Sequence, residues 1–122
     1  MVLFIDDNEA LASLAARILE RTGLTTVTAS DGAGAVAGLA AHADRIAVVV
    51  LDVTMPDITG DVLLGELLAR GLVAPVVVSS GFGREEAMRG FDPSTVAGFL
   101  QKPYRGSELV EMVQSVLGPG DG

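Results

Sequence analysis

The chain alternates between short aliphatic runs and segments whose apolar residues recur at helical spacing. Aliphatic and β-branched runs bounded by turn residues are typical of strands, whereas apolar residues at i, i+3, i+4 and i+7 indicate one face of a helix. The runs that we predict to be strands are residues 2–5, 24–29, 46–51, 75–79 and 97–101. The segments predicted to be helices are one after Asp7 that ends at Gly23, then residues 31–41, 60–70, 84–91 and 106–117.

Four of the five predicted helices carry an apolar stripe that we expect to be buried. The stripes are Leu11, Leu14, Ala15, Ile18 and Leu19; then Val36, Leu39 and Ala40; then Val62, Leu63, Leu67 and Leu68; and last Leu109, Met112, Val113, Val116 and Leu117. Gly23 is placed to terminate the first of these helices in a left-handed conformation, and Gly71 ends the helix at 60–70.

Five successive strand and helix units predict an α/β fold with a doubly wound parallel sheet. Parallel neighbours need crossover connections, and the crossover helices cover both faces of the sheet. Residues 24–29 alternate Thr and Val like a half-exposed strand, so we place them at a sheet edge. We see no internal linker or repeat, and we predict one domain at residues 1–118 followed by a flexible tail at 119–122.

Composition narrows the class of protein. The 122 residues are 49% apolar, enough for one domain with a sizeable core, and contain no cysteine for disulfides or thiolate catalysis. The net charge of −8 disfavours a surface for nucleic acid or anionic membranes. There is no apolar run of about 20 residues, and the start lacks the basic region of a signal peptide, so we expect a cytoplasmic protein.

The residues that follow the predicted strands are chemically related. Asp6 and Asp7 follow the first strand, Asp52 the third, Ser79 and Ser80 the fourth, and Lys102 the fifth. In open α/β sheets ligands bind at the carboxyl ends of the strands. Three clustered carboxylates favour a hard cation such as Mg²⁺, and with Lys102 the charges balance well enough to accept a dianionic phosphoryl group.

Each of these residues also has a simpler structural interpretation. Asp6 and Asp7 could cap the first helix, Ser79 and Ser80 are common turn residues, and Phe99 is typical of a core aromatic. Lys102 could be an ordinary surface lysine, but it is the one lysine of the chain, the seven other basic residues being arginine. His42 has no partner in view, and we assign it no role.

At these residues the chain resembles the receiver domain of bacterial two-component response regulators. The resemblance rests on F-I-D-D, on D-V-T-M-P around Asp52, on V-S-S-G after the fourth strand and on G-F-L-Q-K-P-Y, and it spans nearly the whole chain. It implies a flavodoxin-like fold of five strands in the order 2-1-3-4-5 with five helices. It also implies a signalling domain rather than an enzyme, which receives a phosphoryl group from a histidine kinase or a histidine phosphotransfer domain.

The resemblance assigns the metal and phosphoryl site residue by residue. Asp52 is the expected phosphoacceptor. Asp7, Asp52 and the backbone carbonyl of Thr54 would ligate Mg²⁺, with Asp6 supporting the metal through water. Lys102 would pair with the phosphoryl group.

The resemblance also implies a switch. Ser80, rather than Ser79, fits the hydroxyl that bonds a phosphoryl oxygen, because it immediately precedes Gly81. Phe99 fits the aromatic residue that changes rotamer, remodelling the face of helix 4, strand 5 and helix 5, through which a homodimer could form. Two departures from the family pattern are the short helix predicted at 84–91 and a phenylalanine at 99 where a tyrosine is often found.

Other functions fit parts of the sequence. Gly32-x-Gly34-x-x-Ala37 matches a dinucleotide fingerprint, and Asp52 follows Gly32 by 20 residues, near the spacing of a ribose-binding acid. The fingerprint belongs after a central strand, however, and residues 24–29 are typical of an edge. A phosphatase that forms an aspartyl phosphate would carry a second acid at the position of Thr54. A receiver-like interaction module that is never phosphorylated is the remaining alternative.

The sequence leaves the context of the domain open. A stand-alone regulator and a segment of a hybrid histidine kinase both fit. The residues F-I-D-D-N-E-A-L and G-F-L-Q-K-P-Y resemble those of receivers in hybrid kinases and favour the segment. The cognate kinase, the downstream output and the phosphoryl lifetime have no signature in the chain.

Overall fold

A parallel sheet in the strand order β2-β1-β3-β4-β5 organises the chain in the computed structural model, which describes residues 1–118. Its strands are β1 (Val2–Ile5), β2 (Thr26–Ala29), β3 (Val48–Asp52), β4 (Val76–Ser80) and β5 (Gly98–Gln101). The helices are α1 (Glu9–Glu20), α2 (Gly32–His42), α3 (Gly60–Ala69), α4 (Arg84–Ala87) and α5 (Gly106–Leu117), with a 3₁₀ helix at Pro93–Thr95. The predicted fold class, strand order and edge position of β2 are confirmed. The predicted tail at 119–122 lies outside the described residues.

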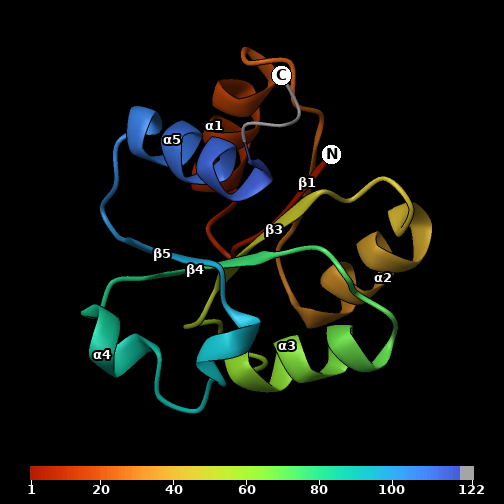
Figure 1. The fold of residues 1–122 in the computed structure, drawn as a ribbon, viewed down its shortest axis with the longest axis vertical. Helices are drawn as coiled ribbons and strands as arrows, with labels where there is room; N and C mark the ends of the chain where they lie inside the picture. The colour runs from red at the N-terminus through yellow and green to blue at the C-terminus, as the bar shows by residue number, and fades with distance from the viewer. Residues whose placement is uncertain (119–122) are drawn as a thin grey trace.

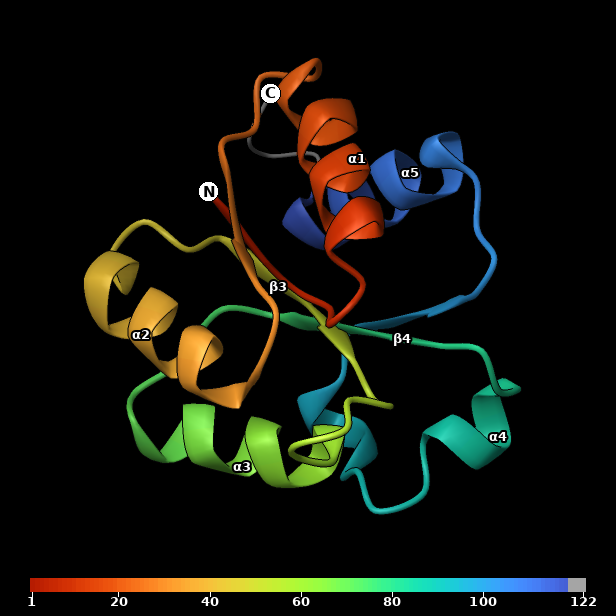
Figure 2. The same ribbon diagram turned by 180° about the vertical axis from the view of Figure 1, so that it is seen from behind.

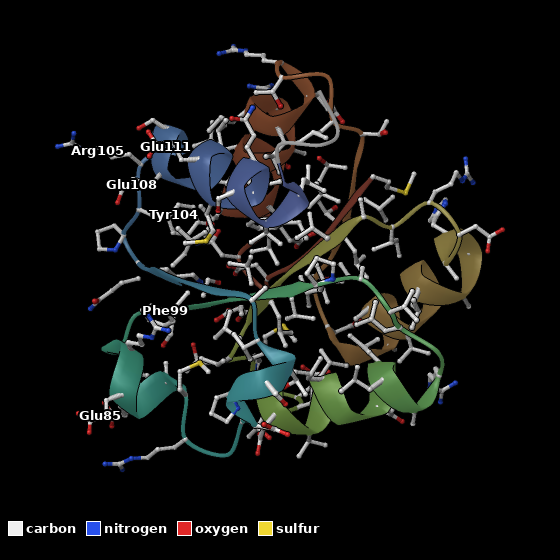
Figure 3. All side chains as sticks on the ribbon, viewed as in Figure 1. Glu85, Phe99, Tyr104, Arg105, Glu108 and Glu111 are labelled. Carbon is white, nitrogen blue, oxygen red and sulfur yellow. The ribbon has the colours of Figure 1, made fainter. Side chains whose placement is uncertain are left out.

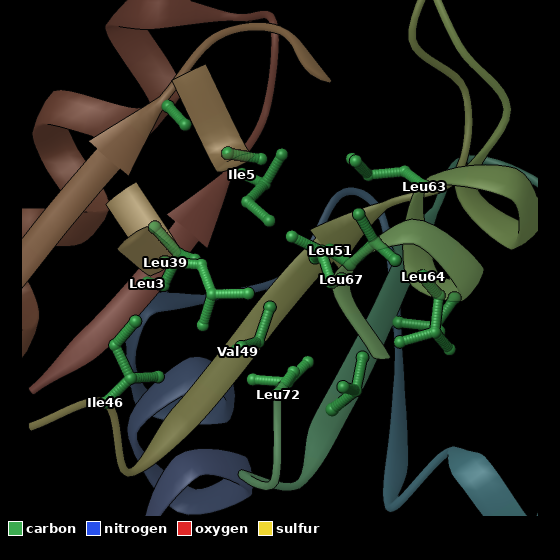
Figure 4. Close-up of a cluster of buried hydrophobic side chains, with 14 of the residues drawn as sticks. Leu3, Ile5, Leu39, Ile46, Val49, Leu51, Leu63, Leu64, Leu67 and Leu72 are labelled. Carbon is green, nitrogen blue, oxygen red and sulfur yellow. The ribbon is translucent and has the colours of Figure 1, made fainter. Parts of the chain in front are cut away.

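The helices form a layer on each face of the sheet. Helices α1 and α5 cover one face and α2 and α3 run side by side on the other, as the two opposite views show (Figure 1 and Figure 2). Apolar side chains of β1 and β3 alternate between the two layers: Leu3 and Val49 pack towards α2 and α3 (Figure 4), whereas Phe4 and Val50 pack towards α1 and α5. Every residue of β1, β3 and β4 is buried, as expected for strands covered on both sides.

The ends of the helices follow local chemistry. Asn8 caps α1, its side chain accepting from the Leu11 N–H, so Asp6 and Asp7 do not serve as the side-chain cap of this helix. Gly23 has a φ angle of 91°, which confirms its left-handed termination of α1, and Gly71, just after α3, has a φ angle of 98°. Within residues 1–118 no helix combines the length and apolar character needed to cross a membrane.

Several predicted buried positions are wrong. Leu14, Val62 and Leu68 are 53%, 58% and 42% exposed, because the buried arcs of α1 and α3 are narrower than their apolar stripes. On α2 Ala40, which we expected to be buried, is exposed, and Gly38 is buried instead. A Cβ at Gly38 would lie 3.0 Å from Leu3 Cδ1, so α2 sits close against the sheet and a larger side chain there would have to displace Leu3.

The predicted helix at 84–91 is also shorter than expected. Helix α4 ends at Ala87, and Gly90 adopts a φ of 87°, a conformation that does not continue a helix. Asp92 then begins the separate 3₁₀ turn by accepting from the Ser94 N–H. The segment between β4 and β5 is therefore two short turns of helix joined by a bend.

Glycines 60 and 65 of α3 provide a matched test of packing. A Cβ at Gly60 would lie 2.8 Å from the Val53 Cα, whereas a Cβ at exposed Gly65 meets nothing within 4 Å. We expect Gly60→Ala to lower the free energy of unfolding by about 1–3 kcal/mol. Gly65→Ala should raise it by about 0.5–1 kcal/mol through helix propensity. Urea denaturation followed by circular dichroism measures both, and similar effects of the two substitutions would contradict the close packing at Gly60.

Candidate functional site

Three strands end in the same local structure at the carboxyl edge of the sheet. In each case a side chain accepts a hydrogen bond from the N–H two residues later: Asp6 Oδ1 from Asn8 at 2.9 Å, Asp52 Oδ1 from Thr54 at 3.1 Å and Ser80 Oγ from Phe82 at 2.9 Å. Such turns satisfy N–H groups that leave the sheet ladder. They also fix the orientation of two carboxylates and a hydroxyl at one edge of the molecule.

The carboxylates predicted to bind a cation lie together. Asp6, Asp7 and Asp52 each offer an oxygen, and these atoms lie within 4.8 Å of one another. Asp6 and Asp52 are each 1% exposed, whereas Asp7 is open to solvent. An all-oxygen donor set with one solvent-facing side suits Mg²⁺, which keeps several waters when bound to a protein. The residues present therefore fit the predicted magnesium site.

Lys102 neutralises part of this cluster. Its Nζ lies 2.7 Å from Asp6 Oδ2 and 3.4 Å from Asp52 Oδ2, and its backbone N–H donates to the Ser80 carbonyl at 2.7 Å. Burial disfavours the ammonium, but the hydrogen bond to Asp6 and the charges of both carboxylates more than offset it and raise the pKa of Lys102. Burial is also the main reason that the pKa of Asp6 is raised, even though Lys102 and the Asn8 N–H oppose that effect.

Asp52 has its two oxygens in different environments. Oδ1 accepts from both the backbone N–H and the hydroxyl of Thr54, the latter at 3.2 Å, while Oδ2 faces Lys102. The sequence assigned Thr54 a backbone carbonyl role and missed its hydroxyl contact. A threonine two residues after an acid at a strand end is the signal that could have indicated it.

The two serines that end β4 differ in their hydrogen bonds. Ser80 is buried and its hydroxyl accepts from Phe82, whereas the buried Ser79 hydroxyl has no hydrogen-bond partner within the described residues. Ser79 lies opposite Asp52 in the register of β3 and β4. The assignment of Ser80 to the phosphoryl site stays a prediction.

Phe99 is not part of the polar cluster. It is half-buried on β5, packs against the core on the α2 and α3 side and borders a groove of about 470 Å³ whose other wall is α5, including Glu108, Glu111 and Met112. Tyr104 was given no role from the sequence. Burial, helped by the charges of Asp6 and Asp52, raises the pKa of its phenol, and its hydroxyl has no hydrogen-bond partner among residues 1–118.

The start of α2 does not favour the dinucleotide alternative. The Gly32 N–H donates to the Asp57 carboxylate at 2.9 Å and the Gly34 N–H donates to Asp31 at 2.7 Å. The amides that would hold a pyrophosphate are thus already bound to carboxylates of the chain. Asp52, the expected ribose-binding acid, is paired with Lys102, and the strand before the fingerprint is the edge strand β2.

Comparison with known proteins gives a consistent result. A model of the response regulator receiver domain family matches residues 2–114. The transcriptional regulatory protein FixJ of Azorhizobium caulinodans is 37% identical over 118 residues, which cover 93% of this chain and 53% of FixJ. The chain thus spans about half the length of this relative.

Two solved structures are similar throughout the chain. The receiver domain of the hybrid histidine kinase CckA is 33% identical with a TM-score of 0.79, covering 95% of this chain and 97% of that one. A chain of the CheX-CheY-BeF3-Mg+2 complex from Borrelia burgdorferi is 28% identical with a TM-score of 0.84, covering 94% of this chain and 87% of that one.

The ion pairs of Lys102 predict a pH-dependent loss of stability. Lys102→Met leaves the buried Asp6 carboxylate without its cation, so we expect the free energy of unfolding of the metal-free protein to fall by about 3 kcal/mol at pH 7. The pKa of Asp6 is higher in the folded protein than in the unfolded chain. Ionisation of Asp6 therefore costs stability as pH rises, and the loss should shrink as acid protonates Asp6 towards about pH 4.

Urea denaturation across this pH range measures the effect, with Asp6→Asn added in a double-mutant cycle. The double variant should recover most of the loss, because no buried carboxylate then needs the cation. A loss of equal size at both ends of the range would show instead that Lys102 contributes through the packing of its aliphatic stem.

Proposed function

The chain belongs to the response regulator receiver domain family, and we propose that Asp52 is the residue that accepts its phosphoryl group. Receiver domains are signalling domains rather than classical enzymes, and they interact with histidine kinases and phosphotransfer proteins. The observation that carries the proposal is the position of Asp52: its carboxylate ends β3 beside Asp6, Asp7 and the ammonium of Lys102. We take residues 1–118 as one such domain.

The proposed transfer needs a placed nucleophile and neutralised charge. One Asp52 oxygen attacks the phosphorus of a phosphohistidine, forming a P–O bond as the P–N bond breaks, and the electron pair leaves with the imidazole, which takes a proton from solvent. Lys102 lies 3.4 Å from Asp52 Oδ2 and would turn from the carboxylates to an oxygen of the incoming group. The domain would thereby promote its own phosphorylation and later dephosphorylation.

We assign the metal site to Asp7, Asp52 and the backbone carbonyl of Thr54, with Asp6 acting through water. When bound, Mg²⁺ supplies positive charge that offsets the repulsion between the phosphoryl oxygens and the carboxylates. The solvent-facing side of the cluster at Asp7 leaves room for the waters of the ion. The similar CheX-CheY complex, which contains Mg²⁺ and BeF3, supports this choice of metal.

The switch would act through Ser80 and Phe99. The Ser80 hydroxyl accepts from the Phe82 N–H and can still donate its own hydrogen to a phosphoryl oxygen. As the hydroxyl moves towards that oxygen, Phe99 on neighbouring β5 could move inwards. Figure 3 shows Phe99 between β5 and α4, with Glu108 and Glu111 on the α5 side of the same face. Phosphorylation would favour one arrangement of this α4, β5 and α5 face, and we propose it as the surface of a homodimer.

A phosphohistidine donor is the partner that this chemistry requires. We propose that a histidine kinase or a histidine phosphotransfer domain supplies it, and the likeness to the receiver of a hybrid histidine kinase is consistent with either source. The short α4 makes β5 and α5 the larger part of the output face, so the partner contacts there would involve these two elements most.

The phosphoacceptor is tested with acetyl phosphate and Mg²⁺. We expect the wild-type protein to gain one phosphoryl group by intact-mass measurement and Asp52→Asn to gain none, because the amide cannot act as the nucleophile. Asp44→Asn, an exposed acid remote from the site, is the matched control and should be labelled like the wild type. Equal labelling of Asp52→Asn and the wild type would refute the assignment.

The metal site is tested with beryllofluoride, which imitates a phosphoryl group. With Mg²⁺ present it should raise the melting temperature by about 5–10 °C, as expected of a ligand near a hundred times its Kd. Without Mg²⁺ the shift should vanish, and Asp7→Asn should abolish most of it. Thermal melting followed by circular dichroism measures the shift. Equal stabilisation by beryllofluoride with and without Mg²⁺ would count against the carboxylate cluster as a magnesium site.

A further inference from the structure

The loop after the phosphoacceptor strand is attached to a helix that does not otherwise contribute to the site. Residues 53–59 connect β3 to α3, and near the far end of this loop the Asp57 carboxylate accepts from the Gly32 N–H at 2.9 Å, across 25 positions of sequence. The first amides of a helix lack partners within the helix and carry its partial positive charge. Asp31 satisfies the Gly34 N–H, so carboxylates from two different segments share the first turn of α2.

The fit between loop and helix is close at Gly32, where a larger residue would push against the loop. A Cβ at Gly32 would lie 3.1 Å from Ile58 Cγ2 and 3.3 Å from Asp57 Oδ2, both atoms of the loop. A Cβ at Gly34 would lie 3.0 Å from Asp31 Oδ1. The glycine spacing that matches a dinucleotide fingerprint thus lets the chain's own carboxylates approach the helix.

The same loop holds the groups that face the metal site. Thr54 donates its N–H and its hydroxyl to Asp52, and it forms an isolated antiparallel bridge with Thr59. The Gly60 N–H donates to the Val53 carbonyl at 3.2 Å and closes the base of the loop. Asp57 lies between these closures, so its attachment to α2 limits how the whole loop, including the Thr54 backbone, can move.

We propose that Asp57 is a positioning residue for the metal site, acting by fixing the loop that carries Thr54 to the first turn of α2. This inference rests on the proposed function, because it takes the Thr54 carbonyl and Asp52 as ligands. Ligand atoms must be held within about 0.5 Å of their productive positions. A loop freed from α2 would hold the Thr54 carbonyl less well, and metal binding would have to order it.

Calorimetric titration with Mg²⁺ tests the proposal. Asp57→Ala should weaken the binding of Mg²⁺ by about ten-fold, the low end of the effects seen for groups that hold ligands in place. Asp57→Asn keeps an oxygen that can accept from Gly32, so its Kd should stay within about two-fold of wild type. Amide hydrogen exchange at Gly32, measured by NMR without metal, should be faster in the alanine variant and protected in the asparagine variant.

The rate of Asp52 labelling as a function of Mg²⁺ concentration should separate an effect on metal binding from an effect on phosphoryl transfer. With acetyl phosphate, Asp57→Ala should need more Mg²⁺ for half-maximal labelling of Asp52, while the rate at saturating Mg²⁺ stays within about two-fold of wild type. A fall in the saturated rate alone, with an unchanged Mg²⁺ requirement, would overturn the proposal.

Asp31→Ala is the matched control, because it removes a carboxylate from the same helix end without touching the loop. It should lower thermal stability about as much as Asp57→Ala, yet leave the Kd for Mg²⁺ within about two-fold of wild type. If both alanine variants weaken Mg²⁺ equally, the contact merely stabilises α2 and the inference is wrong. If wild type binds Mg²⁺ and is labelled on Asp52 but Asp57→Ala matches it, this inference alone fails. If the wild-type protein neither binds Mg²⁺ nor is labelled on Asp52, both the proposed function and this inference are wrong.

Discussion

The balance of charge among Asp6, Asp7, Asp52 and Lys102 is the constraint on which the rest of the structure depends. Two of the carboxylates are buried at the ends of strands, where an unpaired charge is costly, and the single lysine of the chain reaches both. This contact is possible because β1 lies beside β3 in the centre of the sheet and β5 follows β4 at the edge. The strand order therefore brings the cation to the acids. Three carboxylates still outnumber one ammonium, and a divalent ion would offset the remaining negative charge.

The polar edge of the sheet is ordered by short-range turns rather than by long-range packing. The same two-residue turn ends β1, β3 and β4, so each functional side chain is held by the backbone that follows it. These bonds hold Asp52 and Ser80 in place. The Ser80 hydroxyl accepts from the Phe82 N–H and still has its own hydrogen to donate, and in the proposed switch it would donate that hydrogen to a phosphoryl oxygen. The turns thus hold the side chains in place and leave their remaining hydrogen-bonding capacity facing the site.

Fold and site differ in how well the sequence predicts them. The strands and the placement of acids, serine and lysine at strand ends follow from aliphatic runs that stop at polar residues, whereas the strand order was implied by the family resemblance. The helix surfaces do not, because an apolar stripe says nothing of how close a helix approaches the sheet: Gly38 is buried and Ala40 is not, while Leu14 and Val62 are exposed. The segment after β4 fails for a different reason. The helix expected at 84–91 cannot continue through the positive φ at Gly90 and the turn begun by Asp92.

The glycine fingerprint shows why a local motif cannot decide function by itself. Glycines at a helix start permit the approach of any anion, whether a phosphate or a carboxylate of the same chain. Here Asp57 lies 25 residues from Gly32 and no pattern in the sequence connects them, because the contact depends on the loop after β3 folding back against α2. Once Asp57 occupies that position, the amides are unavailable to a nucleotide, and the helix end holds the loop that follows Asp52. The anion at this glycine motif is a side chain of the same chain, and the phosphoryl chemistry that we propose lies elsewhere, at the end of β3.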